Sequence, residues 1–132
     1  MASIFTKIVE GEIPAYKVAE NDNFLAFLDA MPLVEGHVLV IPKVEIDYIF
    51  DLEDDLYLEL QLFAKRVALG LKKGISCKRV GVAVIGLEVP HTHIHLVPLQ
   101  TMDDINFSRE KMSISRERME ELQKMIKDQI KI

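Results

Sequence analysis

Three of the four histidines of this chain lie at alternate positions within one short segment, EVPHTHIHLVP at residues 88–98. In a β-strand, alternate side chains point to one face, so the imidazoles of His91, His93 and His95 should form a row. Ile94 and Leu96 should face the other way, whereas a helix would scatter the histidines around its axis. We therefore predict a strand in this segment, bracketed by Pro90 and Pro98.

A row of imidazoles on a strand has three interpretations. The first is a solvent-facing polar surface, although Thr, Lys or Glu would serve that purpose as well. The second is a metal site, because neutral imidazole is a common ligand of zinc, copper and iron. The third is a phosphate-directed site, in which one imidazole acts as a nucleophile and the others orient it or bind oxygen atoms. The spacing alone leaves the last two open.

Composition narrows the class of protein. The 132 residues predict a single domain, and 49% hydrophobic and 28% charged residues are typical of a globular protein. A net charge of −5 argues against nucleic acid as a partner, although a local site could still bind a small anion. Cys77 is the only cysteine, so no internal disulfide is expected. We find no signal peptide and no apolar run long enough to cross a membrane, and we expect a cytoplasmic protein.

Periodicity and turn residues predict the remaining elements. We expect helices over residues 4–10 and 52–73, with Asp51 as the N-cap and Gly74 as the C-cap of the second. A third helix should follow Ser115, with an apolar stripe at Met119, Leu122, Met125, Ile126 and Ile130. Strands are expected over residues 16–20, 24–29, 37–43 and 80–89, in addition to the histidine strand. This order indicates an α+β fold with a five-stranded antiparallel sheet, one long central helix and terminal helices.

Four ordered blocks of sequence resemble the histidine triad (HIT) superfamily, in its Hint-like branch. They are the HTHIHLV segment at 91–97, the GHVLVIPK segment at 36–43, LAFLD at 25–29 before Pro32, and IFTKI at 4–8 with GEIP at 11–14. The resemblance covers about residues 3–99 and leaves a C-terminal tail and helix at about 100–132.

The resemblance implies a HIT-like fold that dimerises into a ten-stranded sheet, and a purine nucleotide as ligand. It implies cleavage at the α-phosphorus of nucleoside monophosphate derivatives, with no cofactor or catalytic metal. His93 would form a nucleotidyl-histidine, and His91, His95 and His37 would orient it, bind phosphate and move protons. Asp29 would accept the ribose hydroxyls, although an Asp before Pro32 is also a turn residue. The expected nucleotide-binding residues also include Ile4, Phe5, Ile8, Phe27, Ala30 and Glu88.

The chain departs from the family pattern at two places. Many relatives bind a structural zinc through a Cys-x-x-Cys pair and a histidine, at positions held here by Ser3, Thr6 and Glu45, so we expect no structural zinc. Val80, Leu87 and Glu88 replace polar residues expected near the phosphate. Glu88 could fix a histidine tautomer, ligate a metal or face solvent.

Three functions follow from these observations. The first is a nucleotide phosphoramidase or nucleotidyl hydrolase. The second is a catalytically weak purine-nucleotide-binding regulatory protein, favoured by Val80, Leu87 and Glu88. The third is a metal-dependent hydrolase that uses the triad as ligands, although no set of acidic residues accompanies the histidines.

Overall fold

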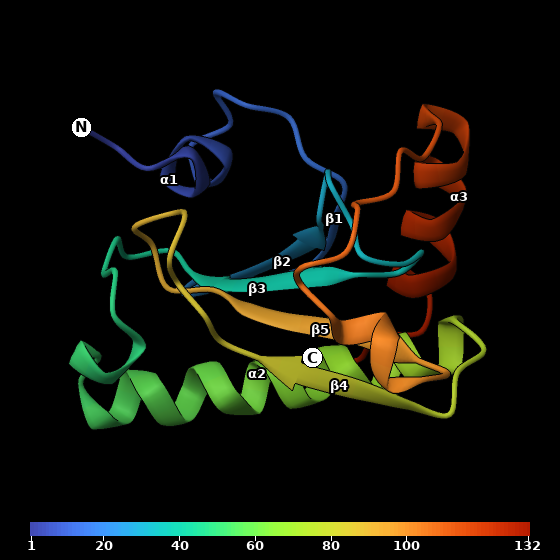
Figure 1. Ribbon diagram of the computed structural model, residues 1–132. Helices are drawn as coiled ribbons and strands as arrows, with labels where there is room; N and C mark the ends of the chain where they lie inside the picture. Colours follow the sequence, from blue (N-terminus) through green and yellow to red (C-terminus); the bar gives the residue numbers. More distant parts are fainter.

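The computed structural model describes residues 1–132, which form one five-stranded antiparallel sheet with helices on both sides (Figure 1). The strands, in the spatial order β1-β2-β3-β5-β4, and the α-helices have the following bounds: β1 Lys17–Glu20, β2 Phe24–Leu28, β3 Val38–Pro42, β4 Arg79–Ala83, β5 Ile94–Leu99, α1 Ile4–Val9, α2 Asp54–Gly74 and α3 Arg116–Lys127. Two short 3-10 helices lie at Ile49–Asp51 and Met102–Ile105. The α+β class, the five strands and the three helices are therefore confirmed.

The two central strands are buried on both faces, as their continuous apolar sequences predict. Val38 and Val40 of β3 belong to the larger core, which packs beneath α2 and α3. Leu39 and Ile41 point to the opposite face and form a smaller core with Phe5 of α1. Figure 1 shows α2 along one side of the sheet and α1 on the other. The smaller core leaves this second face only partly covered, and the cavity described below opens there.

The long helix α2 buries the predicted stripe, which includes Leu60, Phe63, Val67 and Leu71. The predicted caps are wrong. Asp51 lies in a 3-10 helix, the N-cap position is Glu53 without a side-chain cap bond, and Gly74 is still helical. Asp51 and Glu53 are both acidic, so the sequence does not show which of them precedes α2. The short 3-10 helix at Ile49–Asp51 comes first, and α2 starts after Glu53. No helix combines the length and hydrophobicity that crossing a membrane requires.

Two predicted strands are too long at the ends that meet near the histidines. β4 ends at Ala83 rather than residue 89, and β5 begins at Ile94 rather than directly after Pro90. Residues 84–93 form an irregular connection that turns at Gly86, where φ is +74° and a side chain would be strained. Only His95 of the triad lies in a strand. The prediction of faces holds from His93 onward, because Ile94 and Leu96 enter the larger core while His93 and His95 line the cavity.

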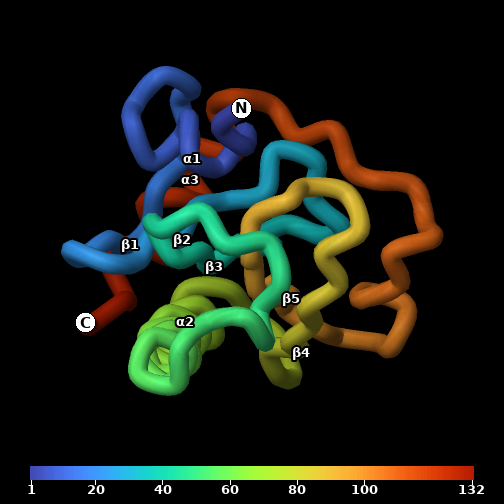
Figure 2. Tube along the Cα trace, turned by 90° about the vertical axis from the view of Figure 1, so that its left-hand side faces the viewer, coloured from blue at the N-terminus to red at the C-terminus, as the bar shows by residue number.

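The tail after β5 does not leave the domain. It runs along one side of the molecule before forming α3 (Figure 2). Arg109 Nη2 donates to Leu33 O at 2.9 Å, and Met112 N donates to Pro32 O at 2.8 Å, so the tail is tied to the β2–β3 connection. Ser115 is the N-cap of α3, as predicted, and Met119, Leu122 and Ile126 are buried. Met125, predicted in the stripe, is 40% exposed.

Candidate active site

A cavity of about 640 Å³ opens on the α1 face of the sheet. Its walls come from α1, β2, the 84–93 connection and the tail. It brings together every site residue predicted from the sequence except His91, namely Ile4, Phe5, Ile8, Phe27, Asp29, Ala30, His37, Glu88, His93 and His95. Residues from distant parts of the chain thus form one concave site with an apolar end and a histidine end.

One ring nitrogen of His93 is held by the backbone. Its Nδ1 lies 2.7 Å from the carbonyl oxygen of His91, and because a carbonyl can only accept, Nδ1 carries the proton. In this tautomer Nε2 is the unprotonated nitrogen, on a side chain that lines the cavity. The Phe5 ring meets that of His93 edge-on, with centroids 5.1 Å apart, which restricts rotation of the imidazole. This arrangement leaves a free lone pair at a fixed place in the cavity.

His37 and His95 form a hydrogen-bonded relay, and the position of each ring proton follows from the hydrogen bonds that the rings make. The Leu33 N–H donates to His37 Nδ1 at 3.0 Å, so the His37 proton is on Nε2. That Nε2–H donates to His95 Nδ1 at 2.9 Å, which leaves the His95 proton on its own Nε2. Burial lowers the pKa of His37 to about 3 and that of His95 to about 4. Both rings are neutral at pH 7, and His95 offers an N–H donor beside His93.

Asp29 serves the turn and faces the site at the same time. Its Oδ1 accepts from Met31 N at 2.9 Å, as in the turn interpretation, while Oδ2 lies 3.6 Å from His37 Nε2. This contact is not an ion pair at pH 7 because His37 is neutral there. Burial raises the pKa of the Asp29 carboxyl. The carboxylate therefore lies at the cavity wall with acceptor capacity to spare.

The ring of His91 points away from the cavity. Its Nε2 donates to Pro42 O at 2.8 Å, and its Nδ1 lies 2.9 Å from Ser3 Oγ. Glu45 Oε1 accepts from Ser3 N and from Thr6 Oγ1, each at 2.6 Å. The bond from the Ser3 backbone is the larger cause that lowers the pKa of Glu45. The expectation that the three histidines share one face is therefore wrong for His91, whose ring belongs to a separate polar cluster.

Two tail residues complete the cavity, and the sequence did not point to them. The Phe107 ring packs edge-on against His95 at 4.7 Å between centroids. Lys111 Nζ donates to Phe107 O at 3.0 Å and is the only lysine or arginine that lines the cavity. The tail has no periodic pattern at these positions. The bonds of Arg109 and of the Met112 backbone to the β2–β3 connection hold the tail in place at the site.

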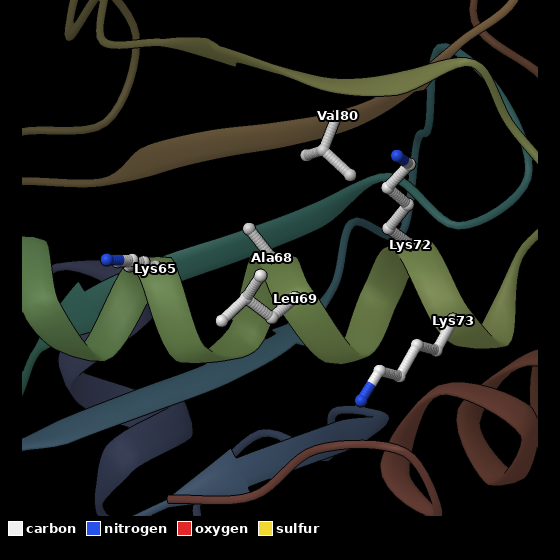
Figure 3. A pocket seen from close by; sticks show the side chains of 6 residues that line it. All are labelled: Lys65, Ala68, Leu69, Lys72, Lys73 and Val80. Atoms are coloured by element: carbon white, nitrogen blue, oxygen red, sulfur yellow. The ribbon is translucent and has the colours of Figure 1, made fainter.

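The three departures from the family pattern lie in different places. Leu87 and Glu88 line the cavity on the 84–93 connection, and Leu87 is 88% exposed. Val80 lies on β4 and lines a different groove against α2 (Figure 3). Val80 therefore does not bear on phosphate contacts, contrary to the interpretation from the sequence.

Asp29, His37 and His95 lie close enough together to be considered as metal ligands, with one atom from each within 4.8 Å of the others. The donor set does not fit a metal, because His37 Nε2 is protonated and donates to His95 Nδ1. A metal would have to break this bond and compete with the Leu33 N–H. These residues therefore give no support to metal-dependent hydrolysis.

Comparison with known proteins agrees with the fold. A sequence model of the HIT domain matches residues 10–102. A HIT-like protein of Borreliella burgdorferi is 37% identical over 131 residues, covering 93% of this chain and 94% of the relative. This chain belongs to the HIT family.

Two further relatives are informative. The adenosine 5'-monophosphoramidase HNT1 of Saccharomyces cerevisiae is 37% identical over 98 residues, which cover 74% of this chain and 62% of HNT1. The crystal structure of a HIT-like protein of Bartonella henselae, described as involved in cell-cycle regulation, superposes with a TM-score of 0.85. It is 27% identical and the match covers 97% of this chain and 96% of that one. The tail beyond residue 102, which supplies Phe107 and Lys111, lies outside the matched HIT domain.

Proposed function

We propose that this protein is a purine-nucleotide hydrolase or transferase that cleaves nucleoside monophosphate derivatives at the α-phosphorus. The observation that carries the proposal is the unprotonated Nε2 of His93, held in a cavity beside the N–H of His95. The family membership and the similarity to a yeast monophosphoramidase support the same class of reaction.

The chemistry runs in two displacements. The lone pair of His93 Nε2 attacks the α-phosphorus, and the bond to the leaving group breaks with its electron pair remaining on that group, which takes up a proton from water. A second water then attacks the phosphorus of the nucleotidyl-histidine, the P–Nε2 bond breaks with its electron pair returning to Nε2, and the attacking water loses a proton to solvent. His95 Nε2–H donates to a phosphoryl oxygen, where negative charge is shared in the transition state. The His37 N–H holds His95 in the required tautomer.

The other end of the cavity suits a nucleoside. Ile4, Phe5 and Ile8 of α1 and Phe27 of β2 line an apolar part of the cavity that suits the faces of a purine ring. Asp29, between this pocket and the histidines, has a carboxylate that can accept both hydroxyls of a ribose. Lys111 places one positive charge at the phosphate end, where Asp29 and Glu88 would otherwise repel an anion.

A single-turnover reaction tests the proposal. An adenosine phosphoramidate labelled at phosphorus is mixed with excess protein in the presence of a chelator, and the protein is quenched and separated. We expect label on the protein within one turnover, followed by release of AMP. Nucleotide binding without label or product would instead establish the second candidate, a binding protein with little turnover, which the exposed Leu87 and the acidic Glu88 favour.

We also propose that two copies pair through β4 to make a continuous ten-stranded sheet. β4 is an edge strand, and Val82 on it is 60% exposed. Leu58, Leu62 and Leu69 form a second apolar stripe on α2, each at least half exposed. Figure 3 shows Leu69 and Val80 at the groove between these two elements, with lysines at its ends. Burying such a face is typical of a symmetric dimer interface.

Charges placed on this face should separate the copies. With Leu69→Glu and Val82→Glu together, symmetry brings carboxylates close to one another, and we expect the dimer dissociation constant to rise about 100-fold or more. Sedimentation equilibrium measures it. Met125→Glu, on α3, is the matched control and should leave the assembly unchanged. A wild-type protein that sediments as a monomer at all concentrations contradicts the dimer.

A further inference from the structure

A closed set of hydrogen bonds joins the start of α1 to the connection that carries His91. Ser3 and His91 in this set are buried, Thr6 is partly buried and Glu45 is exposed to solvent. Its members are Ser3, Thr6, Glu45 and His91, and we call it the Glu45 network. The question is what these side chains do, since none of them lines the cavity.

The direction of each bond follows from its acceptors. Pro42 O can only accept, so the His91 proton is on Nε2 and its Nδ1 is an acceptor. The Thr6 hydroxyl proton is used by Glu45 Oε1 at 2.6 Å. Ser3 Oγ–H is therefore the donor to His91 Nδ1 at 2.9 Å, and Ser3 Oγ in turn accepts from Thr6 N at 3.0 Å. Thr6 Oγ1 also lies 3.3 Å from Ser3 Oγ and 3.3 Å from His91 Nδ1, and both contacts are longer than the bonds named above.

The network ends on the atom that orients His93. His91 is fully buried and its ring is held at both nitrogens. Its carbonyl oxygen accepts the His93 Nδ1–H at 2.7 Å. The bonds that hold the His91 ring therefore help to fix the residue whose carbonyl sets the tautomer and direction of His93. The same bonds fix α1, whose Phe5 contacts both rings, at 5.9 Å from His91 and 5.1 Å from His93.

We propose that Glu45 is a positioning residue for His93, acting through Ser3, Thr6 and His91 without touching the substrate. Its oxygen accepts from both the backbone N–H of Ser3 and the hydroxyl of Thr6, and so orders the start of α1 against the histidine connection. Ser3 then holds the His91 ring. This inference rests on the proposed function, because it assigns the network to the nucleophile of that reaction.

The Glu45 network joins the start of α1 to the histidine connection without a metal. Zinc in proteins is held by thiolate, imidazole and carboxylate groups. Here one imidazole nitrogen and one carboxylate are accompanied by two hydroxyls, which are poor zinc ligands, and both lone-pair donors already accept short hydrogen bonds. The residues do not fit a structural zinc. Hydrogen bonds hold the two segments together instead.

The test compares three variants of the full chain. Glu45→Gln keeps an oxygen that accepts both bonds, whereas Glu45→Ala removes it. Glu12→Ala, which changes an exposed residue beyond α1, is the matched control. Thermal unfolding verifies that each variant is folded. Turnover of the phosphoramidate gives kcat and KM, and ¹⁵N spectra of the imidazoles give the tautomers of His91 and His93 independently of activity.

For Glu45→Ala we expect kcat to fall about tenfold to a hundredfold, as a small misplacement of a nucleophile does, with a smaller change in KM. The His93 signals should change from a single Nδ1–H tautomer to a mixture. Glu45→Gln and Glu12→Ala should keep wild-type kcat and tautomers, and no variant should take up stoichiometric zinc.

A loss confined to KM, or an equal loss in Glu45→Gln and Glu45→Ala, overturns the inference, as does zinc uptake by the wild type. Failure of the proposed function is a different result, in which wild-type protein gives no turnover at all. In that case the tautomer spectra decide whether Glu45 positions His93.

Discussion

Replacing His93 by alanine is expected to abolish the labelled protein intermediate and to lower kcat by at least about 1,000-fold. The reason is that Nε2 of His93 is the only unprotonated imidazole nitrogen that faces the cavity. His95 presents an N–H there, and the nitrogens of His37 and His91 are engaged elsewhere. No neighbouring side chain can take over the attack. Quenched-flow measurement, with chelator present, gives the rate of label transfer to the protein and the rate of turnover.

Two controls distinguish loss of the nucleophile from damage to the binding pocket. Nucleotide binding by the alanine variant should persist, because the apolar pocket of Ile4, Phe5 and Phe27 is unchanged. Exogenous imidazole should restore part of the turnover, since the cavity left by the ring can admit it as an external nucleophile. Wild-type kcat in the alanine variant contradicts the assignment of His93 as the nucleophile. Loss of nucleotide binding would show that the substitution acts on the pocket instead.

The parts of the fold predicted well are those that a single hydrophobic pattern determines. β3 has apolar side chains at every position, so both its faces must be covered, and they are. The register of β5 follows from alternation, because Ile94 and Leu96 must enter the core and His95 must then face the cavity. Leu39 pairs with His95 and lines the same cavity, which places the histidine end over the centre of the sheet.

The hydrophobic pattern gave wrong predictions for segments that line the cavity rather than pack in the core. Residues 84–89 are as apolar as a strand, yet Ile85 and Leu87 are exposed at the cavity rim. Hydrophobicity alone does not distinguish a core strand from the wall of a binding site. His91 continues the alternation of the triad, but Ser3 and Pro42 hold its ring away from the row. Neither partner is visible in the local sequence.

The two site residues of the tail, Phe107 and Lys111, could not be predicted from the sequence for a different reason. Phe107 and Lys111 reach the site because Arg109 binds Leu33 O and the two carboxylates of Asp103 and Asp104. The contact between Arg109 and Leu33 joins residues more than seventy positions apart in the sequence. No periodicity connects them, so local reasoning leaves the tail unassigned. It nevertheless carries the only lysine of the cavity.

Acidification provides the second large effect, on stability rather than catalysis. In an unfolded chain the histidines protonate near pH 6.5. In the folded protein, burial lowers the pKa of His37 to about 3 and that of His95 to about 4, and neighbouring histidines and Lys111 add to the shifts. Between pH 6.5 and 4.5 the unfolded state binds more protons, so the free energy of unfolding falls as pH falls.

We expect this loss to reach about 4 kcal/mol between pH 6.5 and 4.5, since each histidine contributes up to about 1.4 kcal/mol per pH unit. The pKa of His91 is also lowered by burial and acts in the same direction. The carboxyls of Glu20, Glu35, Glu45 and Asp104, whose pKa values are lowered, lose their stabilising ionised form only at more acidic pH. Asp29, with a raised pKa, offsets a part of the loss near the acidic end.

Urea unfolding followed by circular dichroism at several pH values measures this slope. The variant with His37→Asn and His95→Asn is the matched comparison, because it removes both titrating rings. It is expected to be less stable at pH 7 and to show a much shallower dependence on pH. An unchanged free energy of unfolding in the wild type between pH 6.5 and 4.5 contradicts the prediction, because it would mean that both rings protonate in the folded state. The relay that holds His95 as a neutral donor would then be absent near neutral pH.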